Sequence, residues 1–62
     1  MFFRKKLIEF LIPLLIENHI PVNRTKIKKF LIFHKINTKY ELNQVFTKSE
    51  FLQQYQAYEA MV

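Results

Sequence analysis

The side chains that could act as acids, bases or nucleophiles are few and scattered. The two histidines, His19 and His34, lie fifteen residues apart, and Ser49 is the only serine. All five acids are glutamates that stand singly along the chain, at Glu9, Glu17, Glu41, Glu50 and Glu59. No spacing among them pairs two carboxylates for general acid–base catalysis. We therefore expect the protein not to be an enzyme and to have no catalytic residues.

Two residue types that phosphate and metal sites often need are missing altogether. The chain has no cysteine, which excludes disulfides and thiolate metal sites. It also has no glycine, whereas a P-loop and a dinucleotide-binding fingerprint both need glycine where the backbone meets phosphate. We expect no metal and no cofactor.

The basic residues are the remaining candidates for chemistry, and they are unevenly distributed. Residues 1–35 contain eight lysines and arginines and two glutamates, a net charge of +6, whereas residues 36–62 have a net charge of −1. A basic half of this kind can meet nucleic-acid phosphate, an anionic membrane or an acidic protein. The alternative is that these lysines form only a solvated surface.

The N-terminal segment, MFFRKKLIEFLIPLLI, has a basic start followed by apolar residues, as signal peptides do. However, Glu9 interrupts the apolar stretch, and the following residues offer no small-residue cleavage site. The uninterrupted apolar run covers only residues 10–16, whereas a bilayer-spanning helix needs about 20 residues. We expect a cytoplasmic protein, and a helix on the membrane surface is the less favoured alternative.

Two prolines divide the first third of the chain. Proline suits the first position of a helix but not its interior, so Pro13 predicts a short helix over residues 13–19 that ends before Pro21. Sixty-two residues form at most one domain. We predict an apolar N-terminal arm or strand at residues 1–11, followed at residues 12–62 by a helix-turn-helix with a hairpin and a C-terminal helix.

A basic helix is predicted over residues 24–35, with Asn23 as its N-cap. Its inner face carries Ile27 and Phe30, while Ile32 and Phe33 fall on the side that should face solvent. The excess of apolar residues on so short a chain indicates self-association or a protein partner. We take Phe2, Phe3, Ile32 and Phe33 as a candidate interaction surface.

The last third of the chain predicts a turn region followed by a helix. Strand-favouring Tyr40 and Val45 flank Asn43, which favours a short β-hairpin over residues 38–47, with a short helix as the alternative. Thr47 and Glu50 match the capping box that begins a helix. The final helix is therefore expected to run from there towards the C-terminus.

In this order of elements the sequence resembles small winged helix-turn-helix proteins of the excisionase and MerR-like group. The stretch IPLLIENHIPVNR is similar to that family's first helix and turn, RTKIKKFLIFHKI to its DNA-reading helix, and KYELNQVFTKSEF to its wing and closing helix. The resemblance implies an α+β fold that is mostly helical, with a β-hairpin as the wing. The alternative fold is an all-α helical bundle.

The resemblance implies a DNA-binding protein that acts as a recombination directionality factor or a small transcriptional regulator. The DNA-binding residues would lie in the basic helix and beside the hairpin, at Asn23, Arg24, Thr25, Lys26, Lys28, Lys29, Lys35, Lys39 and Lys48. A weaker resemblance links ENHIPVNRTKIKKFLIFHK to the helix hairpin of Sin-type antirepressors. The alternative function is therefore a protein-interaction module, such as an antirepressor or a phage-type inhibitor, and a homodimer or a protein partner is expected.

Overall fold

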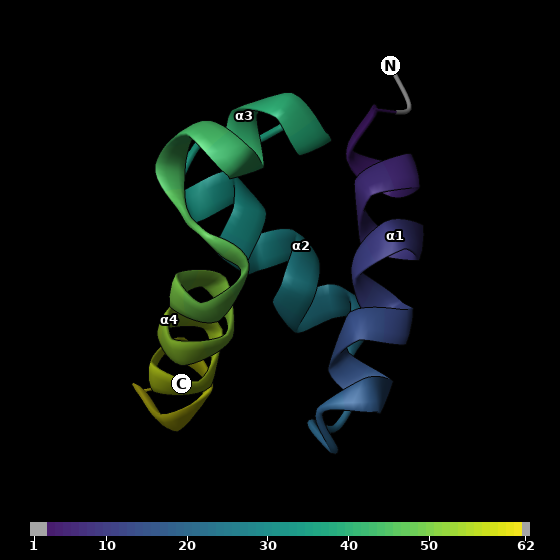
Figure 1. Ribbon diagram of the computed structural model, residues 1–62, viewed down its shortest axis with the longest axis vertical. Coiled ribbons are helices and arrows are strands. Elements are labelled where there is room, and N and C mark those ends of the chain that lie inside the picture. The colour runs from purple at the N-terminus through teal and green to yellow at the C-terminus, as the bar shows by residue number, and fades with distance from the viewer. Residues whose placement is uncertain (1–2, 62) are drawn as a thin grey trace.

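The computed structural model describes residues 3–61, which form four α-helices and no strand. They are α1 (Phe3–Glu17), α2 (Arg24–Phe33), α3 (Lys39–Val45) and α4 (Lys48–Met61). The helix α2 lies in the centre, with α1 packed on one side of it and α4 on the other. The short helix α3 crosses one end of the molecule, opposite the C-terminal end of α4 (Figure 1). The fold is therefore a small all-α bundle.

The predicted β-hairpin at residues 38–47 is wrong, because this segment contains the helix α3. Thr38 begins the helix with a capping box. Its Oγ1 accepts a hydrogen bond from the Glu41 amide at 3.1 Å, and the Glu41 carboxylate accepts one from the Thr38 amide at 3.0 Å. This pairing satisfies two amides that would otherwise lack partners. Without a hairpin there is no wing, so the predicted winged helix-turn-helix is also wrong and the all-α alternative agrees with the structure.

The predicted break at Pro13 is not present either, because α1 continues through it. One face of α1 is buried on both sides of the proline, by Leu7 and Leu11 before it and Leu15 after it. Pro13 itself is exposed, so its ring does not enter the core. Burial of this leucine face outweighs the local cost of proline, as tertiary packing often does. Residues 3–11 are thus the first part of a helix and not an extended arm.

The core is centred on Phe30 of α2, which is fully buried. Five aromatic rings surround it with centroid separations between 4.6 and 6.0 Å, from His34, Phe46, Phe51, Tyr55 and Tyr58. Several of these pairs meet edge to face, an arrangement that aromatic rings favour. The inner face of α2 is thereby fixed, and its other face is left to solvent.

Both α1 and α2 end in a left-handed turn that is formed without glycine. His19 and Lys35 have φ angles of 59° and 57°. The amide that follows each of them, of Ile20 or Ile36, donates to the carbonyl five residues earlier at 2.9 and 2.8 Å. This is the Schellman arrangement, which satisfies carbonyls at the end of a helix. Both turns change the direction of the chain sharply, and the one at His19 places α2 against α1.

Candidate functional site

The outer face of α2 is strongly basic. Ile27, Phe30 and Leu31 point into the core, so Lys28 and Lys29 lie on the exposed side, and Lys26 is half-buried at its edge. Residues 18–40 contain six of the ten lysines and arginines and no acid, whereas the rest of the chain has four such cations and five glutamates. The positive charge of the protein is therefore concentrated in α2, in the turn that follows it and at the first residue of α3.

Two of the predicted DNA-binding residues already have partners within the protein. Arg24 forms an ion pair with Glu9 of α1 at 2.6 Å, and both side chains are exposed. The hydrogen bond from Arg24, helped by its charge, lowers the pKa of the Glu9 carboxyl and raises the pKa of Arg24 itself. Asn23 accepts a hydrogen bond from the Lys26 amide at 3.1 Å, which confirms it as the N-cap. These two side chains link and cap helices.

The first turn of α1 adds cations beside the C-terminal end of α2. Arg4 donates a hydrogen bond to the Ile36 carbonyl at 3.4 Å and another to the Asn37 side chain. These contacts bring Arg4 to the turn that also carries Lys35. Sequence reasoning missed this extension, because residues 1–11 were assigned to an arm rather than to a helix packed on α2.

Lys39 and Lys48 do not belong to the basic face of α2. The Lys39 ammonium lies over the ring of Phe10 of α1, 4.2 Å from its centroid. Lys48 lines a hollow between α1 and the α3–α4 corner, whereas Lys26 and Lys29 line a separate hollow beside Tyr58. The predicted contacts of Lys39 and Lys48 with DNA assumed a wing, and they lose their basis without it.

The candidate interaction surface is only partly described. Ile32 and Phe33 are 47% and 68% exposed, so the neighbouring helices leave a large part of both side chains uncovered. Phe33 contacts Tyr58, with ring centroids 6.2 Å apart. Phe2 lies outside the described residues, and of Phe3 only the backbone is described.

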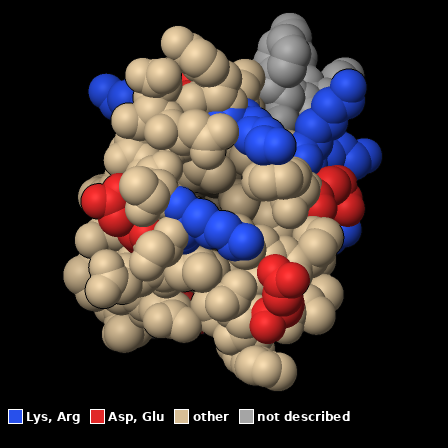
Figure 2. Space-filling model, in the orientation of Figure 1, with Lys and Arg blue, Asp and Glu red and all other residues tan. Residues whose placement is uncertain are grey.

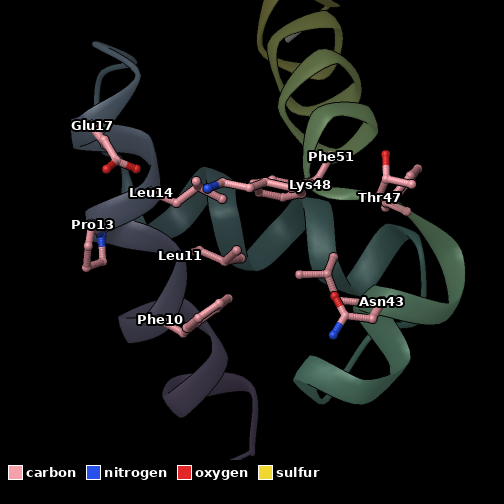
Figure 3. Close-up of a pocket in the computed structure, with 11 residues that line it drawn as sticks. Phe10, Leu11, Pro13, Leu14, Glu17, Asn43, Thr47, Lys48 and Phe51 are labelled. Carbon is pink, nitrogen blue, oxygen red and sulfur yellow. The ribbon is translucent and has the colours of Figure 1, made fainter.

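A second feature, not predicted from the sequence, is an apolar groove of about 520 Å³ between α1 and the α3–α4 corner. Figure 3 shows side chains from both walls pointing into it. Figure 2 shows basic side chains crossing the same face of the molecule, over mostly uncharged surface. The groove is lined by Phe10, Leu11, Pro13, Leu14, Glu17, Leu42, Asn43, Phe46, Thr47, Lys48 and Phe51.

The described residues hold neither a metal-binding cluster nor a membrane-spanning helix. Within residues 3–61, no three histidine or glutamate side chains gather as they would around a metal ion. No helix in this described part has both the length and the apolarity that crossing a bilayer requires. Comparison with protein-family models, curated proteins and solved structures found no match.

Proposed function

We propose that the protein is a cytoplasmic DNA-binding protein that holds the phosphate backbone on the outer face of α2. The observation that carries this proposal is the run of Lys26, Lys28, Lys29 and Lys35, four lysines that form no ion pair within the described residues. Most of that run lies on a helix whose opposite face is anchored by the fully buried Ile27, Phe30 and Leu31. Clustered cations on one face attract the DNA polyanion and supply sequence-independent affinity.

The side chains on this face suit phosphates better than base edges. Lysine is a point charge on a flexible stem, whereas the planar fork of arginine matches the two acceptors of guanine. The only arginine of α2, Arg24, is held by Glu9. We therefore expect the protein to bind DNA with little sequence preference. This proposal does not include the recognition of a specific site, which a site-specific regulator would need.

The strength of the proposed contact can be expressed as a salt dependence. Lys26, Lys28, Lys29 and Lys35 form no ion pair within the described residues. If each neutralises one phosphate, the logarithm of the binding constant should fall with the logarithm of salt concentration with a slope of about −3.6. A slope close to zero would contradict the proposal.

The experiment compares two variants that change the charge equally at different places. Lys28→Glu/Lys29→Glu and Lys39→Glu/Lys48→Glu each lower the net charge by four, from +5 to +1. Fluorescence anisotropy with a labelled DNA duplex at low salt should show that the first pair weakens binding about tenfold or more and flattens the salt slope by about two. The second pair should have a much smaller effect. Equal losses would show that binding follows net charge alone.

A second candidate function is protein interaction through Ile32 and Phe33, because both side chains remain exposed in the folded chain. Large exposed apolar side chains close together often mark an interface. Sedimentation measurements over a range of concentrations test for a homodimer. Ile32→Ser/Phe33→Ser should abolish any dimer formed there, and a monomer at all concentrations would contradict self-association.

A further inference from the structure

We propose that the apolar groove between α1 and the α3–α4 corner binds one amphipathic helix of a partner protein, with acidic residues beside its apolar stripe. This site is separate from the DNA-binding face of α2, and the proposal does not depend on that function. It rests on three features of the groove: its lining, its continuation along α1 and the charge of its rim.

The lining of the groove is apolar and comes from both of its walls. Phe10 and Leu14 of α1 face Leu42 of α3 and Phe51 of α4 across it. Figure 3 shows the Leu14 side chain and the Phe51 ring approaching each other from opposite walls. Its volume of about 520 Å³ is that of a pocket for a small molecule, about 300–1,000 Å³, so it has room for inserted side chains and not for a whole helix. A helix that inserts its apolar side chains would find apolar surface on both sides.

The groove continues along α1 beyond Phe10. This side chain is 45% exposed and also lines a second hollow, of about 280 Å³, together with Lys6, Leu7, Thr38 and Lys39. The two hollows therefore meet at one phenylalanine and together follow the length of α1. A helix that lies in such a track places side chains at positions i, i+3 or i+4, and i+7 into it, as helices bound in grooves commonly do.

The charges at the rim select the chemistry of the occupant. Three lysines line the two hollows, Lys6, Lys39 and Lys48, against a single acid, Glu17. Figure 3 shows the Lys48 side chain extending from the start of α4 across the groove towards Leu14. Complementary charges steer partners and fix their orientation, and like charges placed together reject them. An acidic amphipathic helix is thus favoured over a basic or neutral one.

The test uses a synthetic fluorescein-labelled peptide of about four helical turns, with leucine and phenylalanine on one face and glutamate beside them. Its control is the same peptide with lysine in place of every glutamate. Fluorescence anisotropy should show saturable binding of the acidic peptide to the intact protein and binding at least about tenfold weaker for the basic one. Failure of the acidic peptide to bind, or equal binding of both peptides, would overturn the proposal.

The two double variants of the DNA experiment exchange their roles of test and control here. Lys39→Glu/Lys48→Glu should weaken binding of the acidic peptide about tenfold or more, and Lys28→Glu/Lys29→Glu, with the same change in net charge, should leave it nearly unchanged. Asn43→Trp places a large ring at the exposed edge of the groove and should block the peptide without altering DNA binding. Circular dichroism must show that each variant remains helical.

Two outcomes would assign the groove differently and overturn the proposal. If Lys28→Glu/Lys29→Glu weakens the acidic peptide as much as the groove variants do, the peptide binds the basic face of α2. If the protein self-associates and Asn43→Trp makes it monomeric, the groove is an interface between copies of this chain. Loss of DNA binding alone leaves this proposal standing, and loss of peptide binding alone leaves the DNA proposal standing.

Discussion

His19 and Lys35 hold a left-handed backbone conformation, which is unfavourable for residues with a side chain. Each has a φ angle near 60°, where the Cβ atom approaches the following carbonyl and costs about 1 kcal/mol. Glycine avoids this cost and is the usual residue at this position of a helix end, but the chain contains none. The cost is offset by the turn, which satisfies carbonyls of α1 and α2 and buries Ile20 and Ile36.

Glycine at either of these positions should be more stabilising than alanine. We expect His19→Gly to have a free energy of unfolding about 1 kcal/mol higher than His19→Ala, and Lys35→Gly to show the same difference from Lys35→Ala. Urea denaturation of the four variants measures it. An alanine variant equal to or more stable than its glycine counterpart would show that the left-handed turn is not formed there in solution.

Tyr55 carries the one buried side-chain polar atom within residues 3–61 that lacks a hydrogen-bond partner. Leaving a buried hydroxyl unpaired costs about 1–3 kcal/mol. We expect Tyr55→Phe, which keeps the ring that packs against Phe30 and Phe51, to raise the free energy of unfolding by up to about 1 kcal/mol at neutral pH. Thermal unfolding of the two proteins measures it, and a marked loss of stability would mean that the hydroxyl does have a partner.

The same side chain should make stability depend on alkaline pH. Burial, with a smaller contribution from the charge of Glu59, raises the pKa of Tyr55 to about 12 from a normal value of 10.0. The folded protein therefore keeps its proton where the unfolded chain has lost it, so this contribution is complete below pH 10.0 and is lost as pH rises towards about 12. Wild-type stability should fall more steeply than that of Tyr55→Phe in this window, and parallel curves would contradict the shift.

Among the elements, the starts of α3 and α4 are both marked in the sequence by a capping box, but the prediction used only that of α4. Thr47 and Glu50 correctly predicted the start of α4, where each side chain bonds the other's amide. Thr38 and Glu41 have the same spacing and the same bonds. The strand-favouring Tyr40 and Val45 outweighed that signal in the prediction, yet both are exposed on α3 and do not contribute to the core. Capping chemistry therefore decided this segment over β-propensity.

The ends of α1 and α2 are also marked in the sequence, by a repeated apolar pattern and not by the usual glycine. The pattern Leu-Ile-x-x-x-Ile occurs at residues 15–20 and again at 31–36. In each copy the leucine and the last isoleucine are buried, and the residue before that isoleucine has the left-handed conformation. This apolar contact across the turn commonly accompanies a Schellman end. Without glycine as a marker, this repeated spacing indicates where the left-handed turns lie, whereas Pro21 indicates only that the first helix ends before it.

Pro13 destabilises α1. Proline inside a helix removes one backbone hydrogen bond and costs about 3 kcal/mol relative to alanine. Because Pro13 is exposed, Pro13→Ala should leave the core unchanged and raise the free energy of unfolding by about 2–3 kcal/mol. Pro21→Ala, in the turn between α1 and α2, is the control and should change stability by less than about 1 kcal/mol. Equal effects in a denaturation series would argue against a helix through Pro13.

In the whole molecule, the basic face of α2 and the apolar groove differ in how far they can be predicted from the sequence. The basic face of α2 needs only a local pattern, because Ile27, Phe30 and the lysines between them lie on one helix. The groove joins residues 10–17 with residues 42–51, and it exists only because α1 is a single helix beside the α3–α4 corner. The prediction had an arm in place of the first part of α1 and a hairpin in place of α3, so it contained neither wall of the groove.

The concentration of cations in residues 18–40 should also be visible in the stability of the whole fold. Like charges held close together repel, and salt screens them over about 10 Å at 0.1 M. We expect the midpoint of thermal unfolding to rise as sodium chloride is increased from low concentration to about 0.15 M. The rise should be smaller for Lys28→Glu/Lys29→Glu, and an equal rise in both proteins would indicate that the repulsion lies elsewhere.

The central position of α2 has a consequence for how the molecule opens. Since α1 packs mainly on α2, and the groove separates it from the α3–α4 corner, we expect α1 to detach while α2 and α4 stay together. Native-state hydrogen exchange should then show the amides of α1 exchanging in a smaller opening than those around Phe30, as a separate cooperative unit. A helix bound in the groove would contact α1 on one side and α3 and α4 on the other, and would therefore prevent α1 from detaching alone. The amides of α1 would then exchange only when the whole protein unfolds.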